Sequence, residues 1–166
     1  DKIFKSNPIV VKNNPGKKIF WGDLHAHGWG DSTMLLMHLR REKLVPGGRH
    51  HQAKDIGRLD FGAPGPMSLT DDEEKRKEIW NAYLDAYDRY SECDDYIPFL
   101  SYEAHPGFEG DRQVIYKEKV EEEPPLRGTP AEDLEKIYGD REDVLMEVHI
   151  GGKVPNWDVF RSRKED

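Results

Sequence analysis

Short apolar runs alternate with amphipathic helical segments along this chain, and that alternation most constrains its fold. The runs have the length of buried strands and lie at 18–21, 96–102, 112–116 and 143–149. Apolar residues at helical spacing predict three helices, at about 31–42, 70–91 and 129–139. Strands that alternate with helices are typical of α/β proteins whose sheet is mostly parallel. We therefore expect an α/β domain over 18–166, preceded by a polar lead-in over 1–17.

Glycine and proline interrupt the pattern between Val45 and Met67. Their density breaks any long element, and it predicts an irregular loop that must approach something closely.

Composition limits the function classes. Of the 166 residues, 36% are hydrophobic and 35% are charged, against roughly 45–50% and about 25% in an ordinary domain. The core is therefore small, and we expect marginal stability unless a partner surface completes it, with thermal melting that depends on concentration. A net charge of −8 disfavours unassisted nucleic-acid binding. No apolar run approaches the ~20 residues of a membrane span, and the single Cys93 indicates no compartment, so localisation stays unknown.

The strongest local signal is the segment Asp23-Leu-His25-Ala-His27. In extended chain, residues i and i+2 project to the same side, so both imidazoles would face one point. Such a pair suits a divalent metal, and Asp23 could accept from an imidazole or bind the metal itself. Two surface histidines without a ligand are the alternative.

Two further candidates, Glu103 and His149, follow apolar strands. In parallel sheets the ligand site lies beyond the carboxyl ends of the strands, where these residues and the histidine pair would meet. A buried carboxylate demands a charge partner, which a metal supplies. The alternatives are an exposed carboxylate at Glu103 and a structural histidine at His149.

Weaker candidates lie in expected loops near the same edge. Taken singly, each is more typical of a surface or loop residue, and the set comprises Asp31, His50, His51, His105 and Asp111. The chain has no glycine-rich phosphate loop, no nucleophile elbow and no paired-cysteine motif. Metal chemistry is therefore the best-supported class.

The segment Phe20–His27 resembles the first motif of the PHP superfamily, the polymerase and histidinol phosphatase metal-dependent hydrolases. It is more similar still to a subgroup that opens with Trp-Gly-Asp-Leu-His. Other segments of that subgroup have counterparts here in the same order, at Ser6-Asn7-Pro8, Leu59-Asp60-Phe61, Ser101-Tyr102-Glu103, Gly110–Val114 and Val148-His149.

This resemblance implies a distorted (β/α) barrel holding two or three Mn, Fe or Zn ions, which hydrolyses phosphoesters through a metal-bridging hydroxide. Its metal ligands would be His25, His27, Glu103 and His149. Asp23 would support them or add a ligand. We also consider Arg112 as a group that orients an anionic small-molecule or ester substrate.

The chain departs from the family pattern in two places. The Asp-His expected after Leu59–Phe61 is missing, and no Asp-x-His follows His149. The length is about half of what such a barrel needs. We therefore expect the N-terminal part of a barrel, a fragment that another chain or a missing segment completes.

Several alternatives stay open. One is a non-catalytic metal-binding or structural homologue. Another is an amidohydrolase-type barrel, disfavoured because no lysine sits at a convincing strand end. The sequence leaves undecided the substrate, the metal and its number, and whether His50, His51 or His105 replaces the missing ligand.

Overall fold

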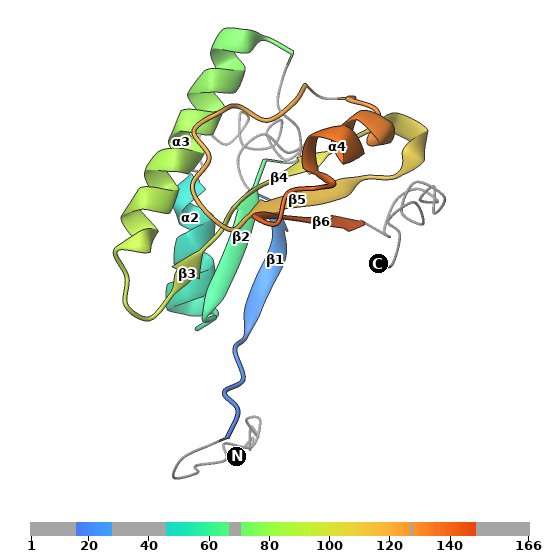
Figure 1. The fold of residues 1–166 in the computed structure, drawn as a ribbon. Coiled ribbons are helices and arrows are strands. Elements are labelled where there is room, and N and C mark those ends of the chain that lie inside the picture. Colours follow the sequence, from blue (N-terminus) through green and yellow to red (C-terminus); the bar gives the residue numbers. More distant parts are fainter. Residues whose placement is uncertain (1–15, 28–45, 67–70, 127, 149–166) are drawn as a thin grey trace, which may run out of the picture.

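The computed structural model describes residues 16–27, 46–66, 71–126 and 128–148, which form a mixed α/β fold (Figure 1). The strands within these residues are β1 (Gly22–His27), β2 (Phe61–Gly65), β3 (Ile97–Pro98), β4 (Leu100–Ala104), β5 (Arg112–Tyr116) and β6 (Val144–Val148). The α-helices are α2 (Pro46–His51), α3 (Glu73–Ser91) and α4 (Ala131–Tyr138). A π-helical turn covers Gln52–Ile56, and a 3-10 turn covers Gly107–Glu109.

The strands form a parallel sheet, β1-β2-β3, and an antiparallel sheet, β4-β5-β6. Backbone hydrogen bonds join the two. The N–H of Phe99 donates to the carbonyl of Gly62 (2.8 Å), and the N–H of Glu103 donates to that of Pro66 (2.9 Å). Consequently β3 and β4 are successive parts of one segment that runs beside β2. The carboxyl ends of β1 and β4 therefore lie at the same edge.

The hydrophobic core lies on one face of the two joined sheets. The amphipathic helix α3 begins at Asp72, whose side chain accepts from the N–H of Lys75 (3.1 Å), a normal N-cap. Helices α3 and α4 lie over the strands in Figure 1. The main core cluster contains Ile79, Trp80, Tyr83, Leu84, Leu100, Tyr102, Ala104, Val114, Tyr116, Leu134 and Tyr138.

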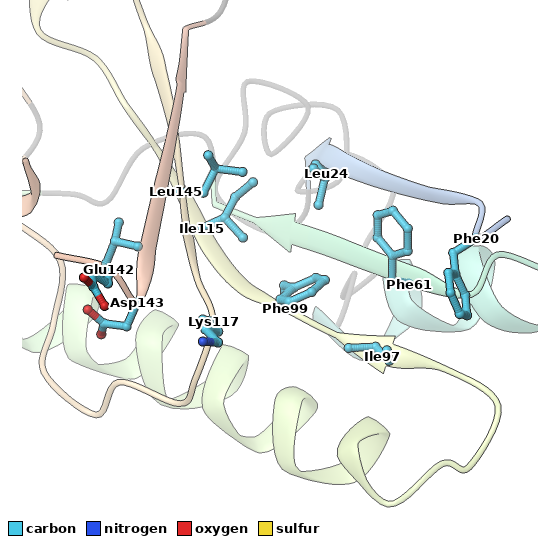
Figure 2. Close-up of a pocket in the computed structure, with 11 residues that line it drawn as sticks. Phe20, Leu24, Phe61, Ile97, Phe99, Ile115, Lys117, Glu142, Asp143 and Leu145 are labelled. Carbon is cyan, nitrogen blue, oxygen red and sulfur yellow. The ribbon is translucent and has the colours of Figure 1, made fainter. Parts of the chain in front are cut away.

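The opposite face of the sheet carries an open apolar cavity of about 580 Å³ (Figure 2). Side chains alternate along a strand, so Ile115 and Leu145 point away from the helices while their neighbours pack in the core. Leu24, Phe61 and Phe99 complete the apolar wall, and Lys117 and Asp143 lie towards one end.

Most of the predicted elements are confirmed. The predicted helices over 70–91 and 129–139 correspond to α3 and α4, and the strands over 112–116 and 143–149 correspond to β5 and β6. The expected strand over 96–102 is divided into β3 and β4. The α/β class is confirmed, although half of the sheet pairings are antiparallel. The helix predicted over 31–42 and most of the lead-in lie outside the described residues.

The prediction of a strand over 18–21 is wrong. The ladder between β1 and β2 begins only at Gly22, which pairs with Phe61. The apolar side chains before it stay exposed, Phe20 at 60% and Trp21 at 68%. An apolar run becomes a buried strand only where a covering layer exists, and none of the described elements covers this run.

The prediction of an irregular loop between Val45 and Met67 is also wrong. This stretch contains α2, the π-helical turn and β2, the middle strand of the parallel sheet. Its glycines permit close packing. A Cβ at Gly65 would lie 2.5 Å from the backbone oxygen of Ser101, so β2 and β4 approach closely only because the side chain is missing. Within the described part of the chain, no helix is both long and apolar enough for a bilayer.

Candidate metal centre

A bulge in β1 shapes the start of the site. Asp23 pairs with Gly62 and Ala26 pairs with Pro64, so β1 carries one more residue than β2 between these points. Within that interval Leu24 lines the apolar cavity, while the Nε2 of His25 lies 3.6 Å from Oε1 of Glu103. The carboxylate of Asp23 accepts from the N–H of His25 (2.9 Å) and so supports the bulge.

Glu103 lies between two imidazoles. Its side chain is 3% exposed, and Oε2 lies 3.5 Å from the Nε2 of His105. On the other side of that ring, Nδ1 lies 3.0 Å from Oδ1 of Asp111. The contact lies at ion-pair distance, and Oδ1 of Asp111 makes no hydrogen bond among the described residues. A carboxylate beside the outer nitrogen of an imidazole is also common at metal-binding histidines.

The spacing of these donor atoms fits a metal ion. Ligands of a tetrahedral ion at about 2.0–2.2 Å are separated from one another by about 3.3–3.6 Å. The separations of 3.6 Å from His25 and 3.5 Å from His105 to the Glu103 oxygens match that edge length. Among the described residues, Glu103, His105 and Asp111 form the group whose ligand atoms all lie within 4.8 Å of one another, and His25 adjoins this group through its contact with Glu103. Mixed imidazole and carboxylate donors suit zinc or iron, and manganese accepts the oxygens.

The structure brings together two of the residues that the sequence singles out, His25 and Glu103. Asp23 is exposed, and its described contact is with the backbone of its own strand. His27 is the last residue of β1. His149 lies outside the described residues. The residue before it, Val148, ends β6 and pairs with Arg112 at the start of β5. The assignment of these residues as ligands stays a prediction.

Arg112 does not occupy the place expected of a residue that orients a substrate. Its side chain is fully buried, and one guanidinium nitrogen donates to the backbone oxygens of Glu109 (3.1 Å) and Gly110. Burial lowers the pKa of Arg112, and the nearby carboxylates of Glu135, Glu109 and Asp111 act against that shift. An arginine keeps its charge in such surroundings, so a buried cation sits directly behind the loop that carries His105 and Asp111.

Of the three histidines left open by the sequence, His105 contacts Glu103. His50 is buried beside Tyr96 and bonds its hydroxyl (Nδ1 to Oη, 2.9 Å). His51 contacts Asp55 at 2.6 Å on the surface. Within the described residues, His105 is therefore the best candidate for an additional ligand.

The structure brings together His105 and Asp111, which the sequence indicates only as weaker candidates. Ala104 and Arg112 form the last pair of the β4–β5 ladder, so residues 105 and 111 face each other at the start of the connecting loop. The signal in the sequence is Glu-x-His at a strand end, followed by an aspartate just before the returning strand. It is informative only once the two strands are known to pair.

Neither a protein-family model, nor a curated protein, nor a solved structure matches this chain. A function must therefore be argued from the chemistry of the site, together with the sequence resemblance.

Proposed function

We propose that this chain holds a divalent cation at Glu103, His105 and Asp111, beside His25, and that it serves a metal-dependent hydrolase of phosphoesters or related esters. The observation that carries the proposal is the buried Glu103 carboxylate with an imidazole Nε2 beside each of its oxygens. The resemblance to PHP-type barrels supports the same metals, zinc, manganese or iron, and the same reaction class.

Electrostatics favour a cation at this point. A carboxylate that is 3% exposed carries a desolvation penalty of several kcal/mol unless a positive charge compensates it. The imidazoles of His25 and His105 carry charge only when protonated. A divalent ion compensates the carboxylate and uses both imidazoles in their neutral form, which is the form that binds metal.

The expected chemistry follows from the donor set. A bound ion would lower the pKa of a coordinated water and so supply a nucleophile near neutral pH. The chain contributes the ligands, and the loop between β4 and β5 carries two of them, His105 and Asp111. The net charge of −8 disfavours polyanionic substrates, but a bound cation reverses the charge locally and permits a small phosphoester.

The test is Glu103→Gln, with Glu118→Gln as the matched control because Glu118 is an exposed residue beyond β5. The amide removes the anionic donor and keeps the shape. After incubation with Zn²⁺ or Mn²⁺ and removal of excess ion, plasma mass spectrometry should find metal in the wild type and in the control. The Glu103 variant should bind at least roughly tenfold more weakly.

Two results would contradict parts of the proposal. Equal metal content in the Glu103 variant and the wild type would exclude this carboxylate as a ligand. Bound metal without turnover of p-nitrophenyl phosphate or its diester would favour the non-catalytic metal-binding homologue over the hydrolase.

A further inference from the structure

The loop between β4 and β5 carries a candidate metal-site residue at each end, His105 and Asp111. It passes through the 3-10 turn and contains two glycines with left-handed backbone, Gly107 (φ 72°) and Gly110 (φ 88°). Glycine adopts this conformation without strain, so the loop can take its shape, but it also has many others available. Other contacts must therefore select the observed shape.

The first of these contacts is made by Arg112, at the start of β5. The buried guanidinium of Arg112 donates to two successive backbone oxygens, those of Glu109 and Gly110. Both carbonyls are thereby turned inward, directly before Asp111. Hydrogen bonds from a charged donor are stronger than those between neutral groups.

A second contact ties the loop to helix α4. Oε2 of Glu109 accepts from the N–H of Ala131 (2.8 Å), the first residue of the helix. Pro130, the N-cap, provides no side-chain hydrogen bond, so Glu109 caps the helix from a distant segment. A carboxylate is also favourable at the positive end of a helix dipole. The helix itself is anchored, because Leu134 and Tyr138 lie in the core.

We propose that Glu109 is a positioning residue of the metal centre: by capping α4 it holds the loop so that Asp111 stays against His105. Metal binding and capping of α4 are then coupled. Coupling between two sites is reciprocal, so an ion bound at His105 should also protect the first turn of the helix. The metal part rests on the proposed function, whereas the pairing of Asp111 with His105 can be observed without metal.

The experiment compares Glu109→Ala, Glu109→Gln and the control Glu132→Ala. Glu132 is in the first turn of α4 and is exposed at 79%, so its replacement removes a helix-stabilising charge without touching the loop. We expect the Kd for Zn²⁺, measured by titration calorimetry, to rise about tenfold in Glu109→Ala. Glu109→Gln, which keeps an acceptor oxygen, and the control should bind like the wild type.

Metal-free readouts complete the test. Near pH 7, the nitrogen-15 signals of the His105 ring should differ between the wild type and Glu109→Ala, because the Asp111 carboxylate would no longer lie beside Nδ1. Faster amide exchange in α4 with unchanged Zn²⁺ affinity would reduce Glu109 to a helix cap and overturn the proposal.

If the wild type binds no Zn²⁺, the proposed function fails, and the His105 spectra decide the positioning role separately. Unchanged nitrogen-15 signals of the His105 ring in Glu109→Ala would then overturn it as well.

Discussion

His50 shows how burial decides the behaviour of a single residue. It is 2% exposed and packs against the rings of Tyr90 (5.0 Å) and Tyr96 (5.7 Å). Burial lowers the pKa of His50 to about 4, and burial also raises the pKa of Tyr96. At neutral pH all three rings are therefore uncharged, and they join α2 to α3 and to the start of β3.

This burial predicts acid sensitivity. The pKa of His50 falls from 6.5 when unfolded to about 4 when folded, so the unfolded state binds the proton more readily and stability is lost as pH falls from 6.5 towards 4. The loss between pH 7 and 4.5 should be roughly 2–3 kcal/mol. Urea unfolding at both pH values should show this extra loss in the wild type and in the control His51→Gln. It should be absent in His50→Gln, and an equal loss there would refute the assignment.

At the scale of elements, the central strand β2 depends on missing side chains. It packs so closely on β4 that the hydroxyl of Ser101 donates to the carbonyl of Ala63 (2.8 Å). Gly65 faces the backbone of Ser101, which cannot rotate away as a side chain could. Gly48 in α2 has the opposite surroundings, because nothing lies within 4 Å of the place that a Cβ would occupy there.

The two glycines predict opposite effects of the same substitution. Gly65→Ala should destabilise the fold by about 1–3 kcal/mol, since the added methyl group overpacks the interface between β2 and β4. Gly48→Ala should stabilise it by roughly 0.5–1 kcal/mol, because alanine has the higher helix propensity and meets open space. Denaturant unfolding measures both values. A neutral Gly65→Ala would show that β2 and β4 have room for a methyl group between them.

At the scale of the whole molecule, the sheet is covered unequally. Helices α3 and α4 bury one face, whereas the other carries the cavity of about 580 Å³. Leu145 and Ile97 on that side are each 54% exposed. Exposed apolar area costs about 25 cal/mol per Å² relative to burial. The expectation that a partner surface completes the core therefore applies to this face.

Concentration-dependent melting tests that expectation. The Tm of the wild type should rise over a roughly hundredfold range of protein concentration, because association covers the apolar face. Leu145→Glu should weaken the dependence. The control Ile137→Glu, at a residue of α4 that is 44% exposed, should leave it unchanged. A cooperative melt of a pure monomer with one Tm at all concentrations would exclude such a partner copy.

The sequence by itself determined the elements whose signals are local. Helix α3 follows from its apolar spacing, and β5 and β6 follow from compact apolar runs. It also singled out His25 and Glu103, which the structure places within β1 and β4, near the carboxyl ends of these strands. These inferences succeed because side-chain period and capping act within a few residues.

Tertiary structure alone decided the rest. It made β2 a central strand in spite of its glycines, and it left the apolar run before Gly22 exposed. It also brought His105 and Asp111 to Glu103 through the hairpin register. The physical reason is that such contacts depend on the pairing and close approach of segments distant in the chain, which no local pattern records.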